Sequence, residues 1–182
     1  MISLSELTIG ELAAYIAEHL RNKGIETVLV GGACISIYSV NEYSSFDLDF
    51  IITGSSTRQK VRAALTEINF TEVNRYFINP QTPFFVEFPS GPLAIGDEPP
   101  SEISTLRFST GNLRLLSPTD CVKDRLAAFY HWKDQQSFEQ AVLIARDHNI
   151  DIEEVRRWSV NEGFADVFEK NVSRLAGTAV SC

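Results

Sequence analysis

Two aspartates stand one residue apart inside an apolar segment, residues 44–52 (SSFDLDFII). The segment predicts a buried strand, and on a strand Asp47 and Asp49 share one face because successive side chains point to opposite faces. Two neighbouring carboxylates repel each other, so at neutral pH they share a proton, bind a cation or contact water. The spacing therefore raises the question of a cation site.

A third acid, Glu87, lies in a second apolar segment that predicts a strand, residues 83–88 (PFFVEF). An ionised carboxylate among apolar residues needs a partner. Oxygen ligands without a nearby His or Cys favour Mg²⁺ or Mn²⁺ over Zn²⁺. The ordinary alternative is that each strand has one solvated face. We favour metal binding by Asp47, Asp49 and Glu87 because a glycine pair precedes the first two acids.

That pair, Gly31-Gly32, ends the predicted strand at residues 25–30 (IETVLV) and opens a short predicted helix at residues 33–40. Backbone N–H groups at such a turn favour an anion, and glycine allows close approach of a phosphate. A plain tight turn is the commoner cause of a glycine pair. Placed before the acid-bearing strand, however, this turn predicts a triphosphate site between the glycines and the acids.

The elements that must position these residues follow from hydrophobic periodicity and turn signals. The order predicts a mixed α/β (α+β) sheet flanked by helices, with a core over residues 1–116 and a helical region over residues 117–182. The sequence from residue 171 onward gives no prediction of secondary structure or function. The predicted helices are a first one capped by Ser5 or Thr8 and ending near Asn22, then 33–40, 55–70 capped by Ser55 or Ser56, 118–132, 135–149 and 151–163; the further predicted strands are 46–52, 71–78, 83–88 and a hairpin over 104–117 turning at residues 109–112.

Composition sets limits on the class of protein. The 182 residues are 44% hydrophobic and 22% charged, an ordinary globular balance, and the net charge of −8 argues against whole-surface binding of nucleic acid. No apolar run approaches the roughly twenty residues that span a bilayer, and the N-terminus lacks a signal layout. Cys34, Cys121 and Cys182 fit neither a disulfide framework nor a zinc pattern, which predicts reduced thiols and a cytoplasmic protein.

Trp132 and Trp158 are expected to pack the helical region, and Tyr38, Phe84 and Phe85 to lie in the core.

Residues 30–51 (VGGACISIYSVNEYSSFDLDFI) resemble the nucleotidyltransferase fold of the DNA polymerase beta superfamily. The signature of that superfamily is a strand, a Gly-Gly or Gly-Ser turn, a helix and an apolar strand carrying D-x-D, with a third acid on a later strand. Ser45 stands where the minimal members often have Ser or Thr. The matching positions are Gly31, Gly32, Asp47, Asp49 and Glu87.

More narrowly, the chain resembles minimal bacterial and archaeal nucleotidyltransferases of the abortive-infection and toxin type. Those continue with a helical motif, K-L-x-A…R-x-K-D…D, and residues 118–141 are similar. Arg125 stands where Lys is usual, Lys133 and Asp134 match, and Tyr43 stands where many relatives have Arg. Arg125 keeps the charge but not the compact ammonium geometry of Lys.

The resemblance implies a function. Asp47 and Asp49 would hold Mg²⁺ or Mn²⁺ on a nucleoside triphosphate, and with Glu87 a second ion that activates an acceptor hydroxyl. Glu87 could also act as general base. The acceptor would be a protein, an RNA such as tRNA, or a small molecule, and a cognate antitoxin or a second copy of the chain are implied partners. The nucleotide contacts would come from Gly31, Gly32, Ser45, Arg125 and Lys133.

Two alternatives stay open. The first is a catalytically silent nucleotidyltransferase fold that binds a partner in a two-component toxin–antitoxin or defence system. The second is an unrelated α/β interaction protein whose acids are solvated. The intact set of Asp47, Asp49 and Glu87 favours the enzyme, because a silent copy has no physical need to keep three repelling acids.

Overall fold

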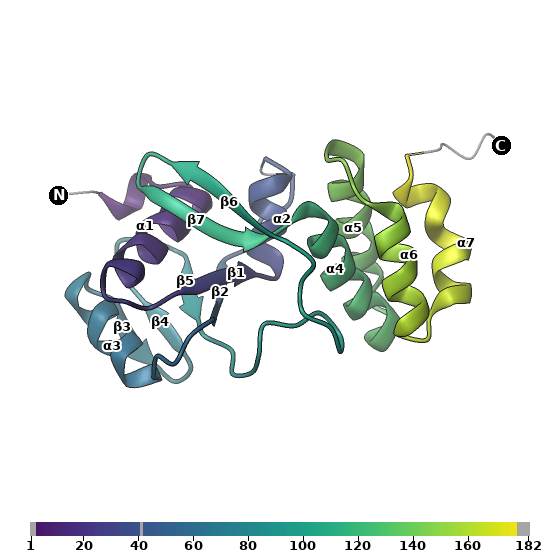
Figure 1. The fold of residues 1–182 in the computed structure, drawn as a ribbon. Coiled ribbons are helices and arrows are strands. Elements are labelled where there is room, and N and C mark those ends of the chain that lie inside the picture. The colour runs from purple at the N-terminus through teal and green to yellow at the C-terminus, as the bar shows by residue number, and fades with distance from the viewer. Residues whose placement is uncertain (1–2, 41, 178–182) are drawn as a thin grey trace.

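The structure, a computed structural model, describes residues 3–40 and 42–177. This part of the chain forms a mixed seven-stranded sheet with strand order β3-β4-β5-β2-β1-β7-β6 and helices around it (Figure 1). The predicted α+β class is confirmed. The strands are β1 (Thr27–Val30), β2 (Asp47–Ile52), β3 (Thr71–Val73), β4 (Tyr76–Ile78), β5 (Phe85–Glu87), β6 (Ile103–Phe108) and β7 (Gly111–Leu116).

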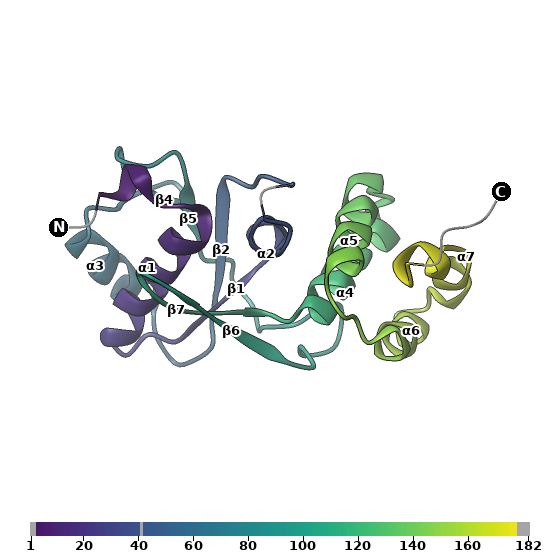
Figure 2. The same cartoon turned by 90° about the horizontal axis from the view of Figure 1, so that it is seen from above.

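The helices separate to the two sides of the sheet. Seen from above, α1 and α3 lie on one side of β2, and α2 with the later helices lies on the other (Figure 2). Local signals fix several helix starts: Thr8 and Glu11 form a capping box at α1, and Ser117 caps α4 ahead of Pro118. The helices are a 3₁₀ turn (Leu4–Glu6), α1 (Ile9–Asn22), α2 (Gly32–Tyr38), α3 (Arg58–Glu67), α4 (Pro118–Trp132), α5 (Gln135–Asp147), α6 (Ile152–Asn161) and α7 (Ala165–Leu175).

Strand β2 runs through the middle of the sheet, antiparallel to β1 and parallel to β5. Its residues alternate in burial as the sequence predicts: Leu48 and Phe50 are fully buried, whereas Asp47 and Asp49 are half-buried. Phe50 stacks on Phe88, the residue after β5, with ring centroids 6.0 Å apart. The apolar face of β2 thus belongs to the core, and the other face carries the acids.

Three predictions of local structure were wrong. The single strand expected over residues 71–78 is a hairpin, because Asn74 adopts a left-handed conformation (φ 57°) that Asn tolerates and that ends β3. The cap of α3 is Thr57 rather than Ser55 or Ser56, since the Thr57 hydroxyl accepts the Lys60 N–H. In the predicted β6–β7 hairpin only residues 109 and 110 form the turn.

The end of the chain holds a helix that the sequence reading missed. Helix α7 buries Phe168 and Leu175, which are spaced as one helical face. Trp158 is fully buried as expected, but Trp132 is 78% exposed. It is the last residue of α4, and the left-handed Lys133 turns the chain away from it. Cys182 lies outside the described residues.

The chain passes from the sheet to the later helices between β7 and α4. A division into a core over residues 1–116 and a helical region over residues 117–182 remains a proposal. Tyr38 is buried as expected, whereas Phe84 and Phe85 are only half-buried. Over the described residues, no helix has both the length and the apolar character needed to cross a membrane.

Candidate functional site

The three acids lie on one face of two neighbouring strands. In the parallel pair β2–β5, Asp49 is the register partner of Glu87, and Asp47 is the partner of Phe85. Asp49 and Glu87 are therefore lateral neighbours, and Asp47 follows two residues away on the same face. The structure thus brings together the three carboxylates that the sequence singled out.

The pKa of Asp49 reports this crowding. Burial, together with the smaller effects of the negative charges of Glu87 and Asp47, raises the pKa of Asp49 from 3.8 to about 6, while the charge of Arg125 opposes them. Within the described part of the chain, the carboxylates of Asp47 and Asp49 make no hydrogen bond or ion pair with another residue. A cation beside them would relieve the repulsion.

The glycine turn lies directly against the acids. Gly31 has φ 69°, and a Cβ atom at this position would lie 3.0 Å from Oδ2 of Asp49. A Cβ atom at Gly32 would lie 3.3 Å from Oγ of Ser45 and 3.5 Å from the hydroxyl of Tyr43. Both the backbone conformation and the space therefore favour glycine at residue 31. The backbone of the turn thus lies in close contact with the Asp49 carboxylate, which a side chain at residue 31 would disturb.

Ser45 has a defined structural task at the start of β2. Its hydroxyl accepts the Asp47 N–H and donates to the Asp47 carbonyl, both at 3.2 Å, and its own N–H donates to Oγ of Ser36 at 2.7 Å. Tyr43, which replaces the Arg of many relatives, presents its phenol to the same glycine turn. The turn, Ser45 and Tyr43 thus form one wall beside the acids.

The helical region contributes Arg125 and one acid that the sequence reading missed. After the larger effects of burial, Glu87 and Asp47, the charge of Arg125 on α4 lowers the pKa of Asp49 and the charge of its neighbour Asp124 raises it. The Arg125 guanidinium donates to Asp124 at 2.9 and 2.5 Å and to Gln140 at 3.4 Å. Lys133 is exposed at the end of α4, and no contact in the described residues links it to the acids.

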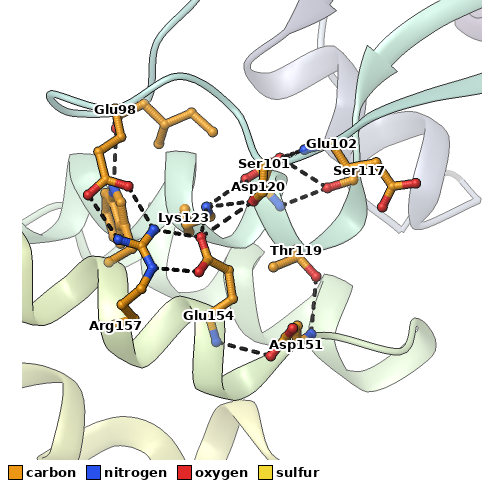
Figure 3. Close-up of polar contacts among 12 residues, drawn as sticks. Glu98, Ser101, Glu102, Ser117, Thr119, Asp120, Lys123, Asp151, Glu154 and Arg157 are labelled. Carbon is orange, nitrogen blue, oxygen red and sulfur yellow. Dashed lines mark hydrogen bonds and ion pairs between the residues drawn. The ribbon is translucent and has the colours of Figure 1, made fainter.

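A buried ion network holds α4 in place (Figure 3). The Lys123 ammonium lies 2.8 Å from Asp120 and 2.8 Å from Glu154 of α6, and it donates to the Ser101 hydroxyl at 2.8 Å. The side chains of Lys123 and Asp120 are 2% and 0% exposed. Because these contacts join α4, α6 and the segment before β6, they also fix the helix that carries Arg125.

Arg75 is the second group that the sequence reading missed. It lies in the turn between β3 and β4, and its guanidinium is 3.3 Å from the Glu87 carboxylate. The same guanidinium donates to the Tyr76 hydroxyl at 2.5 Å and lies over the Tyr76 ring, 4.8 Å from the centroid. With residues 71–78 read as one strand, the position of this side chain could not be predicted.

The residues fit a divalent cation, although they do not form a closed ligand set. Among the described residues, no group of three or more His, Cys, Asp and Glu side chains is arranged to hold a metal ion. The donors are all carboxylate oxygens, as Mg²⁺ and Mn²⁺ prefer. Within the described ranges, the carboxylates of Asp47 and Asp49 have no ion-pair partner, whereas the Glu87 carboxylate is paired with the guanidinium of Arg75. Asp47 and Asp49 are therefore the two acids of this face whose carboxylates are open to a cation, whereas Glu87 is paired with Arg75.

Known structures share the fold. The chain superposes on the crystal structure of an antigenic nucleotidyltransferase-like protein from Paracoccidioides brasiliensis with a TM-score of 0.58 and 16% identity, covering 96% of this chain and 94% of that one. It superposes on the solution structure of the antibiotic-resistance factor ANT(2'')-Ia with a TM-score of 0.51 and 13% identity, covering 92% and 94%. No protein-family model and no curated protein matches the sequence. The chain therefore has a nucleotidyltransferase-like fold, and the narrower resemblance to toxin-type members stays a prediction.

Proposed function

We propose that the protein is a metal-dependent nucleotidyltransferase that moves a nucleoside monophosphate from an NTP to a hydroxyl group. One observation carries the proposal: Asp47, Asp49 and Glu87 share one face beside the Gly31 turn, within a nucleotidyltransferase-like fold. The raised pKa of Asp49 supports it, because that carboxylate is kept in a place where it repels its neighbours.

Each residue has a distinct task. Asp47 and Asp49 would hold Mg²⁺ or Mn²⁺ on the triphosphate, with Glu87 as a further ligand for a second ion, and the bound metal would supply positive charge for the reaction. Glu87 accepts the proton of the acceptor hydroxyl. The acceptor oxygen forms a bond to the α-phosphorus, the bond from that phosphorus to the bridging oxygen breaks, and pyrophosphate leaves. The products are a nucleotidylated acceptor and pyrophosphate.

The nucleotide contacts follow from the wall beside the acids. The backbone of Gly31 and Gly32 approaches the phosphates, and the Ser45 hydroxyl keeps the start of β2 against that turn. Arg125 adds positive charge from α4, in part neutralised by Asp124. For Lys133 we retain a phosphate contact as a proposal that rests on the family resemblance alone.

The acceptor class is a hydroxyl of a small molecule, a protein or an RNA. The net charge of −8 disfavours a long nucleic acid, which favours a small molecule or a protein as the acceptor. We also propose a cytoplasmic protein with a cognate antitoxin or a second copy of itself as partner, on the family resemblance. The silent binding module is the weaker alternative, since it gains nothing from a destabilising acid cluster.

The test is calorimetric titration of ATP, GTP, CTP and UTP with Mg²⁺ and, separately, with EDTA. The wild-type protein is expected to bind at least one NTP in Mg²⁺ only, and Asp49→Asn is expected to lose that binding. Asp97→Asn is the matched control, because Asp97 is an exposed aspartate in the segment before β6. Binding that survives EDTA or Asp49→Asn contradicts the proposal. Transfer from labelled NTP to an acceptor then separates the enzyme from the silent module.

A further inference from the structure

Arg75 is a cation placed on the third carboxylate of the acid face. The pair Arg75–Glu87 is 3.3 Å long, with the Arg75 side chain 67% exposed and the Glu87 side chain 19% exposed. The negative charges of Glu87 and of Asp49 both raise the pKa of Arg75, after the larger effect of its hydrogen bond to Tyr76. The guanidinium is thus paired with the carboxylate of Glu87, the register partner of Asp49.

The backbone around Arg75 is anchored by Arg58, and its exposed side chain is held by Glu87 and Tyr76. The Arg75 carbonyl accepts a hydrogen bond of 2.9 Å from Arg58, which is itself paired with Glu72. Tyr76 is the register partner of Glu87, so the turn is fixed beside the third acid. Within the described part of the chain, only Glu87 and Tyr76 hold the guanidinium. A side chain tethered in this way can change partner without moving the sheet.

We propose that Arg75 is the resident counter-cation of the acid face and a phosphate-binding residue of the loaded site. In the free protein the Arg75 guanidinium is paired with the Glu87 carboxylate, so that only Asp47 and Asp49 are left to bind a divalent cation. When a triphosphate binds, the guanidinium exchanges Glu87 for the phosphate oxygens, and the Glu87 carboxylate becomes free to bind a second cation. This inference rests on the proposed function and adds an order of events to it.

The chemistry of the partners favours this exchange. A guanidinium stays charged at every working pH and binds phosphate oxygens through two parallel hydrogen bonds. An exposed ion pair with a single carboxylate is weak, so a triphosphate competes well for the guanidinium. Because coupling between two ligands is reciprocal, nucleotide and second cation should strengthen each other's binding through Arg75.

The test measures cations directly. Mn²⁺ is titrated into the nucleotide-free protein, with free Mn²⁺ followed by electron paramagnetic resonance, for wild type, Arg75→Ala, Arg107→Ala and Asp49→Asn. Arg107 is the matched control, since it is an exposed arginine of β6 and its removal changes the net charge equally. Wild type and Arg107→Ala are expected to bind one Mn²⁺. Arg75→Ala is expected to bind a second, with an affinity about threefold or more above any second site in wild type.

A second arm measures the phosphate contact. The α,β-methylene analogues of ATP, GTP, CTP and UTP are titrated in Mg²⁺, and Arg75→Ala is expected to weaken the analogue that binds by about tenfold, with Arg107→Ala unchanged. If Arg75→Ala matches Arg107→Ala in both arms while Asp49→Asn abolishes binding, the inference is wrong and the proposed function stands. If the wild type binds neither Mn²⁺ nor any analogue, both are overturned.

Discussion

Asp49 on β2 and Glu87 on β5 are register partners across a parallel strand pair, and the charge of Glu87 helps to keep the pKa of Asp49 near 6. Like charges on adjacent strands destabilise a sheet unless something binds between them. The protein therefore keeps at this position a pair of residues that costs stability in the free state. A site selected for ligand binding explains the pair better than a site selected for stability.

We predict that Asp49→Asn stabilises the free protein. The folded state raises the pKa of Asp49 from 3.8 to about 6, so it binds the proton more tightly than the unfolded state does. The stability of the wild type should therefore fall as pH rises from about 4 to 6 and stay lower above that range. At neutral pH Asp49→Asn should gain about 1–2 kcal/mol of unfolding free energy, since the full shift is only partly realised in a half-buried group.

Urea unfolding of the metal-free protein at several pH values checks this prediction, with Asp97→Asn as control. The gain should shrink toward zero near pH 4, where Asp49 is protonated in the wild-type fold. The groups that face Asp49 are Asp47 on β2, Glu87 on β5, and Asp124 and Arg125 on α4. An Asp49→Asn protein that is less stable than the wild type at neutral pH contradicts the prediction.

We predict that Gly31→Ala removes nucleotide binding for a spatial reason. The new Cβ atom would lie 3.0 Å from Oδ2 of Asp49, and φ 69° is strained for alanine. Gly24→Ala is the matched control, because Gly24 has φ 73° but nothing within 4 Å of a new Cβ atom. Both variants should lose about 1–2 kcal/mol of stability from the left-handed conformation. Only Gly31→Ala should lose NTP binding in calorimetry, and equal binding by both variants would count against the glycine turn as part of the site.

The sequence predicted the parts of the site that depend on local pattern. The common face of Asp47 and Asp49 follows from the two-residue period of a strand, and the turn at Gly31 follows from the glycine pair after an apolar strand. The face of Glu87 could be assigned only as one of two, since it depends on the parallel pairing of β2 and β5. That pairing is a long-range contact, which no local pattern encodes.

Arg75 and Asp124 could not be predicted for related reasons. Arg75 reaches Glu87 because Asn74 breaks an apparently continuous strand, and Asn74-Arg75 lacks the glycine that usually marks a tight hairpin. The charge of Asp124 acts on Asp49 because of how α4 packs on the rest of the molecule, and the buried Lys123 helps to hold that helix. A Lys in an amphipathic helix is normally a surface residue, so the burial of Lys123 could not be predicted from the sequence.

We predict that Lys123→Met strongly destabilises the protein. The variant leaves the fully buried Asp120 without its cation, whereas Glu154 keeps its ion pair with Arg157. Removing one partner of a buried ion pair costs about 3–5 kcal/mol, because the remaining charge stays desolvated. Lys170→Met is the control, since Lys170 is exposed on α7. Thermal unfolding should show a large drop in Tm for Lys123→Met alone. A drop no larger than that of Lys170→Met would mean that the network contributes little.

We finally predict that acid weakens the attachment of the segment before β6 to the helical region. Hydrogen bonds from Arg157 hold the pKa of Glu98 and of Glu154 at about 2. Since these folded-state pKa values lie below the ordinary 4.5, the stabilisation is complete above that value and is lost as pH falls toward 2. Glu98→Gln should cost up to about 1 kcal/mol at neutral pH, because the pair is partly exposed. Glu98→Gln should also reduce the loss of stability between pH 5 and 3 in urea titrations. The control variant Glu6→Gln, at an exposed residue, should leave the acid dependence unchanged. Parallel pH profiles of wild type and Glu98→Gln would show that the Arg157 pair has no part in acid stability.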